Sequence, residues 1–122
     1  MAAPNIVNVT SIFGKTVGAA LGTTTTTDIL TCPTNKVLKI NSIIVSNIDG
    51  TNAADATVYF WDSSAGTRYA LAFTISVPAD ATLVVISKDT SIYLEEGDQI
   101  EAGASAASDL NIVISYEELD DA

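Results

Sequence analysis

The sequence contains no histidine and a single cysteine, Cys32, among its 122 residues. Without histidine there is no Ser-His-Asp or Cys-His triad and no imidazole to carry protons near neutral pH. One cysteine cannot form an internal disulfide, or a cysteine-based zinc site alone. Cys32 precedes a proline and has only Lys36 as a nearby base, so we expect a partly buried structural residue. The sequence therefore predicts a protein without enzymatic activity, catalytic residues or cofactor.

Basic residues are also scarce, with five against fifteen acidic residues and a net charge of −10. All five lie before residue 94, whereas the segment from Glu95 onward has nine acidic residues and no basic one. Such a chain is repelled by a phosphate backbone and by an anionic membrane surface, so neither nucleic acid nor a membrane is an expected partner. The distribution predicts that one end of the domain is strongly negative and would meet a basic partner.

Long apolar runs are absent as well. No stretch approaches the roughly 20 apolar residues that a membrane-spanning helix needs. The opening MAAPNIV has neither the basic nor the apolar region of a signal peptide, so we expect no secretory signal.

Short alternating apolar stretches, separated by turn residues, dominate what remains. The clearest strand is predicted over residues 109–117, where alternate apolar residues share one face. Residues 57–61 have large side chains on both faces, which indicates a central strand or an interface strand. Residues 37–48 either bury both faces or contain a bulge that changes the phase. Residues 70–77 are predicted to be a strand with four apolar side chains on one face, namely Leu71, Phe73, Ile75 and Val77.

About eight such strands at roughly ten-residue spacing predict an all-β fold, a jelly-roll-like antiparallel β-sandwich. Residues 1–22 have few turn signals and are expected to form an extended N-terminal arm, which could end in a strand. Residues 23–117 would then be the sandwich domain, and residues 118–122 an acidic C-terminal tail. We expect a partner interface that combines apolar residues of the arm with two aromatic residues: Ile6, Val7, Val9, Ile12, Phe13, Tyr59 and Trp61.

Residues 93–105, YLEEGDQIEAGAS, place three carboxylates around Gly97. Glu96 and Asp98 are candidate metal ligands, because carboxylate oxygens at alternate positions suit a hard cation such as calcium. The acid, glycine and glutamate pattern of an EF-hand loop is not met. The competing interpretation, which we favour, is a solvated turn in which Gly97 adopts a positive φ angle and Gln99 and Glu101 face solvent.

The C-terminal third also carries a resemblance. DTSIYLEEGDQI at residues 89–100 leads through AGAS at 102–105 to LNIVISYEE at 110–118. This pattern resembles small virion structural proteins of tailed phages, especially those of marine bacteria, in which a similar acidic turn precedes a final strand ending in SYEE. PNIVNV at 4–9 and VSNIDG at 45–50 resemble the same proteins.

The resemblance implies a non-enzymatic capsid decoration (cement) protein that binds the shell, or a tail or neck component. It implies location in the virion after synthesis in the host cytoplasm. The implied partners are the major capsid protein or other virion subunits, together with further copies of the chain in a homo-oligomer. The arm could add a strand to a neighbouring subunit.

A second hypothesis is a calcium- or carbohydrate-binding β-sandwich module. It rests on the acidic turn and on Tyr59, Trp61 and Tyr69, whose rings could stack on sugars. The competing interpretation, which we favour, places Tyr59 and Trp61 in a sheet or a subunit interface.

Overall fold

The computed structural model describes residues 11–120, which form nine β-strands and one short 3-10 helix. The elements are β1 (Ser11–Ala20), β2 (Thr27–Thr31), β3 (Lys36–Asn47), β4 (Ala54–Asp62), β5 (Thr67–Val77), β6 (Thr82–Ile86), η1 (Lys88–Thr90), β7 (Ile92–Leu94), β8 (Gln99–Ala104) and β9 (Leu110–Asp120). Within these residues no helix is long and apolar enough to cross a membrane.

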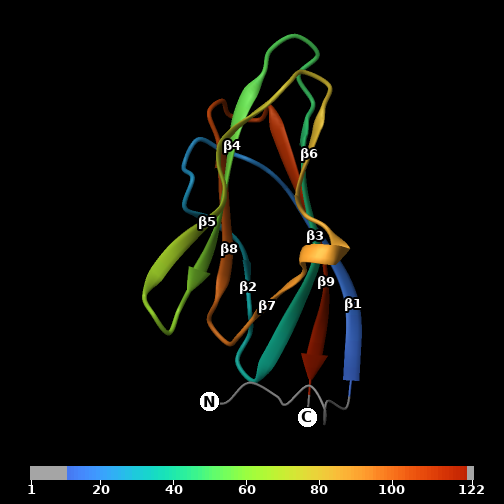
Figure 1. Ribbon diagram of the computed structural model, residues 1–122, viewed down its shortest axis with the longest axis vertical. Helices are drawn as coiled ribbons and strands as arrows, with labels where there is room; N and C mark the ends of the chain where they lie inside the picture. Colours follow the sequence, from blue (N-terminus) through green and yellow to red (C-terminus); the bar gives the residue numbers. More distant parts are fainter. Residues whose placement is uncertain (1–10, 121–122) are drawn as a thin grey trace.

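The strands form two antiparallel sheets that lie face to face, as Figure 1 shows. The five-stranded sheet has the order β1-β9-β3-β6, with β7 also paired to β3, and the four-stranded sheet has the order β2-β8-β4-β5. The predicted all-β antiparallel sandwich is therefore confirmed, with nine strands in place of about eight.

The core lies between the sheets and is formed by the inward-facing residues of their strands. On β9, Leu110, Ile112 and Ile114 are fully buried, as the alternation predicts. Burying one such side chain stabilises the fold by about 1.5–3 kcal/mol relative to leaving it exposed. β3 contributes to the same core and has a register shift between Ile40 and Ser42, so the predicted change of phase is present.

The expected arm over residues 1–22 does contain a strand, but this strand belongs to the sandwich, so the domain boundary is corrected. Residues 11–20 are β1, which pairs with β9 along its whole length, from Ser11 opposite Asp120 to Ala20 opposite Asn111. This pairing satisfies backbone groups of both strands, and Val17 also packs against the core. Because β9 extends to Asp120, the expected tail boundary at residue 118 is corrected too. Residues 1–10 lie outside the described residues, so an arm there stays a prediction.

β5 also departs from its predicted pattern. Phe73 is 59% exposed, and its neighbour Ala72 is buried in its place. The cause is a bulge, because Thr74 adopts a positive φ angle of 47° and the β4–β5 register shifts between Ala56 and Val58. The bulge changes the phase of the strand, so Phe73 no longer shares the face predicted for it.

The five-threonine run at residues 23–27 passes closely over β8. A Cβ atom on Gly103 would lie 2.5 Å from the Cα of Thr25 and 2.6 Å from the carbonyl oxygen of Thr24. Glycine is therefore required at this crossing. The backbone N–H of Ala104 donates to the carbonyl of Gly22 at 2.8 Å, which fixes the loop against the strand.

Candidate functional site

The acidic stretch at residues 95–101 divides into exposed and buried carboxylates. The backbone at Gly97 has a φ angle of +86°, as the turn interpretation predicts. Asp98, however, is only 5% exposed. Its Oδ1 accepts from the backbone N–H of Ser63 and its Oδ2 from that of Glu95, each at 2.9 Å. Asp98 thus ties its own turn to the β4–β5 turn, which corrects the expectation of a solvated carboxylate.

Glu101 is likewise 5% exposed, so its predicted exposure to solvent is wrong. The residue lies opposite Tyr59 in the β4–β8 register. Its Oε1 accepts from Nε of Arg68 at 2.8 Å, and its Oε2 lies 3.5 Å from Nη2 of the same guanidinium. The hydrogen bond to Glu101 raises the pKa of Arg68 above its usual value.

The candidate metal ligands Glu96 and Asp98 are close in sequence but differ in environment. Both carboxylate oxygens of Asp98 are bound by backbone N–H groups. One carboxylate oxygen of Glu96, Oε2, is buried without a hydrogen-bond partner among the described residues. No group of three histidine, cysteine or acidic residues with the geometry of a metal site occurs within residues 11–120. A calcium site here stays a prediction.

The outer side of the four-stranded sheet carries an aromatic cluster built around one guanidinium. The Cζ atom of Arg68 lies 5.0 Å from the ring centroid of Trp61 and 5.9 Å from that of Tyr59. The ring of Phe73 lies 6.4 Å from that of Tyr59 at an interplanar angle of 56°. We call these four residues the aromatic face. Its β4 and β5 side chains meet because Trp61 lies opposite Arg68 in the register.

Ion pairing and ring stacking act on the same cation. Contacts between a guanidinium and an aromatic ring contribute about 0.5–1 kcal/mol at exposed sites. The buried Glu101 carboxylate holds Arg68 at a defined position, and Arg68 lies over both rings. The aromatic face is therefore ordered before any partner arrives.

The residues predicted to form one interface lie in different parts of the molecule. Tyr59 and Trp61 belong to β4 in the four-stranded sheet, whereas Ile12 and Phe13 are exposed residues of β1 in the five-stranded sheet. The remaining predicted residues, Ile6, Val7 and Val9, lie outside the described residues. Tyr59 and Trp61 thus lie on a different sheet from Ile12 and Phe13. Arg68 and Phe73 lie beside Tyr59 and Trp61 and were not predicted from the sequence.

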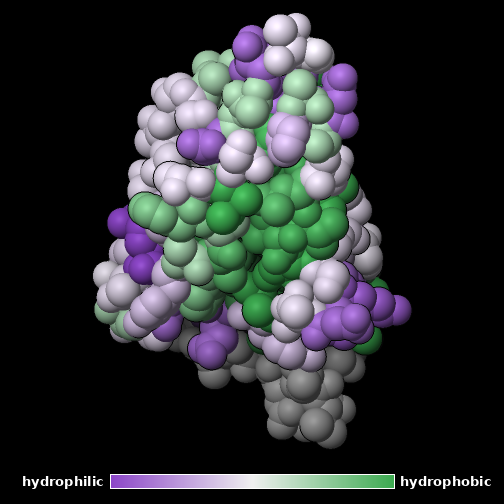
Figure 2. Space-filling model, turned by 45° about the horizontal axis from the view of Figure 1, so that its top comes forward, coloured by the Kyte–Doolittle hydropathy of each residue, from purple (hydrophilic) through white to green (hydrophobic). Residues whose placement is uncertain are grey.

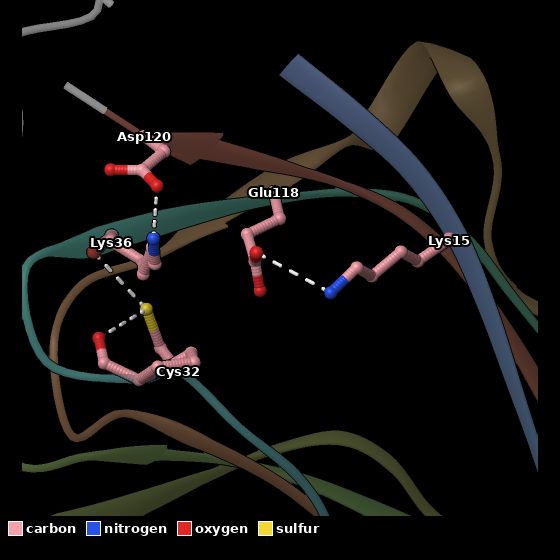
Figure 3. A network of polar contacts seen from close by, with 6 residues as sticks. Lys15, Cys32, Lys36, Glu118 and Asp120 are labelled. Atoms are coloured by element: carbon pink, nitrogen blue, oxygen red, sulfur yellow. Dashed lines mark hydrogen bonds and ion pairs between the residues drawn. The ribbon is translucent and has the colours of Figure 1, made fainter. Parts of the chain in front are cut away.

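The end of the sandwich near residues 96–98 holds a polar network, shown in Figure 3. Lys15 pairs with Glu118 at 3.3 Å, and Lys36 pairs with Asp120. The Sγ atom of Cys32 lies 3.2 Å from the carbonyl oxygen of Lys36, to which it donates. Burial raises the pKa of the Cys32 thiol to about 11, and nearby carboxylates act in the same direction.

The predicted charge segregation is offset in part by ion pairs. Three of the five basic residues pair with carboxylates of the last third of the chain, namely Lys15, Lys36 and Arg68. This happens because β8 and β9 are interior strands of the two sheets and adjoin strands from earlier in the chain. These pairs offset three of the nine acidic residues that follow residue 94, so one strongly negative end stays a prediction.

The sequence matches no known family model and no curated protein. Two solved structures, each a pentameric capsid protein isolated from metagenomic phage sequences, are similar over 98% of this chain at 20% and 21% identity, with TM-scores of 0.38. The chain spans about two thirds of their length, 68% and 66%. The CBM22-1–GH10 modules of Clostridium thermocellum xylanase 10B, complexed with xylohexaose, match 93% of this chain and 26% of their own at 11% identity, with a TM-score of 0.29.

Proposed function

We propose that this chain is a non-enzymatic structural protein of a phage virion, specifically a capsid decoration (cement) protein that binds the shell and stabilises it. The observation that supports this proposal is the aromatic face, a partly exposed group of Tyr, Trp, Phe and Arg side chains on one sheet. Tyrosine, tryptophan and arginine are the residues most enriched where protein interfaces gain their affinity. The resemblance of residues 89–118 to virion proteins supports the same role.

The aromatic face suits a surface that binds another protein with little loss of entropy. Immobilising a long side chain on binding costs about 0.5–1.5 kcal/mol. Arg68 is already held by Glu101 and by stacking, so most of that cost is met within the folded chain. The expected partners are the major capsid protein or other virion subunits, in a virion assembled after synthesis in the host cytoplasm.

The N-terminal segment is proposed as a second contact. Residues 1–10 would add a strand to a neighbouring subunit, with Ile6, Val7 and Val9 in its apolar positions. Ile12 and Phe13 are exposed on β1, which follows this segment directly, and would extend the same contact. Because β1 belongs to the sheet, the deletion that tests the arm removes residues 1–10 and leaves Ser11–Ala20 in place.

The experiment uses phage shells assembled without this protein, incubated with purified wild-type chain and with the Trp61→Ala variant. We expect the wild type to cosediment with the shells and the variant to bind at least about tenfold more weakly. Val113→Ala, on the outer side of the five-stranded sheet, is the matched control and should bind like the wild type. Full binding by Trp61→Ala would contradict the role of the aromatic face, and no binding by the wild type would contradict the proposed function.

Two further experiments test the alternative functions, which are a tail or neck component and a sugar-binding module. Labelled protein found at the tail or neck of intact particles would replace the decoration role with the tail or neck alternative. A carbohydrate module needs open ring faces, yet Arg68 lies over both Trp61 and Tyr59. Heat released on titration with a glycan panel or with calcium would favour the binding-module hypothesis.

A further inference from the structure

The outer side of the five-stranded sheet carries two apolar side chains that solvent hardly reaches. β9 pairs with β1 without interruption, so Val113 and Leu119 both point away from the four-stranded sheet. Val113 is 37% exposed, whereas Leu119 is only 5% exposed. Val37 of β3 lies opposite Leu119 and is also 5% exposed. We call Val37 and Leu119 the covered pair.

The covered pair does not belong to the core between the sheets. Neither residue is a member of the cluster of buried side chains that the two sheets enclose. Among residues 11–120, Ile12 lies beside Leu119 on β1 and is 60% exposed. Lys39 and Glu117, the next outward residues of β3 and β9, lie opposite each other and are half-buried. These neighbours lie in the same sheet, so they shield the flanks of the pair, and its solvent side needs a cover from another segment.

Apolar side chains elsewhere on the surface lack such a cover. Figure 2 looks onto the side of the sandwich between the edge strands β5 and β6 and shows apolar side chains gathered there. Tyr69 and Ile75 of β5 are 54% and 42% exposed. The single chain thus leaves some apolar residues open to solvent, and the low exposure of the covered pair indicates that a particular segment lies over it.

The N-terminal segment, residues 1–10, joins the sheet next to the covered pair. Ser11, the first residue of β1, lies opposite Asp120, which directly follows Leu119. Neighbouring strands are about 4.8 Å apart, so Val37, two strands away from β1, lies roughly 10 Å from it. Ten residues of extended chain span up to about 33 Å. The segment is therefore long enough to cross the outer side of β9 and β3.

The composition of this segment also suits an apolar surface. Residues 1–10 include three branched apolar residues and no charged side chain. At the other end of the chain, Asp121 and Ala122 offer only a carboxylate and a methyl group. A Cβ atom added to Gly14 would meet no atom within 4 Å, so the cover does not run along β1. The segment must instead turn after leaving β1 and lie over β9 and β3.

We propose that residues 1–10 fold back across the outer side of the five-stranded sheet of their own chain and pack their apolar side chains on Val37 and Leu119. The proposal concerns the purified protein and does not depend on the virion role. It places a step before the proposed strand addition, because the segment has to leave the covered pair before it can pair with a neighbouring subunit. Strand addition would then expose Val37 and Leu119.

The first test measures how fast a maleimide reagent labels Leu119→Cys in the full chain, with and without the apolar residues of the segment. The triple variant that removes them carries Ile6→Ser, Val7→Ser and Val9→Ser. Leu119→Cys should react at least about tenfold faster in the triple variant, because labelling then no longer waits for the segment to open. Val113→Cys, on the same side of the same strand, is the matched control and should react equally fast in both.

Cys32 is buried and serves as an internal control, since it should stay unlabelled as long as the sandwich is folded. Equal labelling rates for Leu119→Cys with and without the three serine substitutions overturn the proposal. Faster labelling of Leu119→Cys together with unchanged Val113→Cys and unlabelled Cys32 supports it.

Proteolysis of the unmodified chain keeps the proposal testable if Leu119→Cys fails to fold. Thermolysin cuts before branched apolar residues, and a synthetic peptide of residues 1–10 gives the rate for an unprotected segment. In the wild type, cleavage within residues 1–10 should be at least about tenfold slower than in the peptide. Val37→Ser should restore fast cleavage, and Val113→Ser, the matched control, should not.

The same measurement identifies the chain that supplies the segment. Protection by the chain's own residues 1–10 is independent of protein concentration, and this is the expected result. Protection that is lost on dilution would assign the covered pair to the segment of a second copy and overturn the proposal. Wild-type cleavage as fast as that of the peptide would overturn it as well.

Discussion

The outer sides of the two sheets are built from different kinds of side chain. The four-stranded sheet presents the aromatic face, in which a buried acid fixes a cation between two rings. The five-stranded sheet presents mainly small polar residues, with one apolar row across β6, β3 and β9 formed by Val84, Ile44 and Val113. Both sheets obey the same alternation of inward and outward residues, and only the first has an internal network that orders its surface.

This difference indicates where the acidic residues of the C-terminal third act. Asp98 and Glu101 lie on or beside β8 and hold together turns and side chains of the four-stranded sheet. The carboxylates of β9 contact lysines at the end of the five-stranded sheet, where more solvent reaches them. Removing one such contact from the four-stranded sheet should therefore lower the free energy of unfolding more than removing one from the five-stranded sheet.

The largest expected effect is that of Asp98→Ala. The substitution leaves the part-buried backbone N–H groups of Ser63 and Glu95 without their acceptor, and loss of two hydrogen bonds to a charged group should lower the free energy of unfolding by about 3 kcal/mol. Glu117→Ala on the five-stranded sheet should change it by roughly 0.5 kcal/mol or less. Urea unfolding measures the free energy of unfolding of both variants. Similar losses for Asp98→Ala and Glu117→Ala would contradict the stated difference between the two sheets.

The next largest effect should come from Gly103→Ala. Its Cβ would meet backbone atoms of Thr24 and Thr25, which cannot move without displacing the loop, so we expect a loss of about 2 kcal/mol. Gly14→Ala in β1 meets no atom within 4 Å and should alter stability by less than about 0.5 kcal/mol. Thermal denaturation gives the melting temperatures of both variants. A Gly103→Ala variant that melts like the wild type would contradict the close contact of Thr24 and Thr25 with β8.

The two ion pairs offer a matched comparison in which only a cation is removed. Arg68→Ala leaves the buried Glu101 without its partner, whereas Lys15→Ala leaves Glu118 in a more accessible position. We expect a clear fall in melting temperature for Arg68→Ala and a small one for Lys15→Ala, since exposed pairs contribute little. Raising the salt concentration should diminish the Lys15 effect more. A larger fall in melting temperature for Lys15→Ala than for Arg68→Ala would contradict the greater importance of the ion pair in the four-stranded sheet.

The smallest effect concerns Cys32, which lies at the end of the sandwich. Because burial raises its pKa from 9.0 to about 11, the folded chain holds the thiol proton more tightly than the unfolded chain. This contribution to stability is fully present below pH 9 and is lost as the pH rises from 9 to 11. Between pH 9 and 11 the free energy of unfolding should fall less steeply for Cys32→Ala than for the wild type. Identical pH dependence of the two proteins would contradict the burial of the thiol.

The sequence predicted the fold class well because alternation is a local property. Residues 109–117 alternate without interruption, and β9 follows them closely. The alternation failed over residues 70–77 because a bulge at Thr74 depends on the register with β4, which no local pattern records. The sequence allowed a strand at the end of the arm but did not place β1 in the sandwich, because the partner of β1 lies at the other end of the chain and its glycines weaken the strand signal.

The candidate site was predicted less completely, and for the same reason. Tyr59 and Trp61 were predicted to be interface residues from their size and position alone, and this stays a prediction. Arg68 and Glu101 could not be paired with each other, because they are 33 residues apart and meet only through the order of β8, β4 and β5. Alternation placed Glu101 on the outer side correctly, but it could not indicate that Arg68 and the rings would cover it.

The pairing of β1 with β9 has a consequence for how the chain acquires its structure. Ser11 lies opposite Asp120, so the first and last described strands must find each other across nearly the whole sequence. Sheets formed from such distant segments close slowly, typically in milliseconds to seconds, because loop closure precedes the stabilising contacts. On the ribosome the five-stranded sheet cannot be completed until β9 has emerged, and until then its partner strands β1 and β3 remain unpaired along that edge.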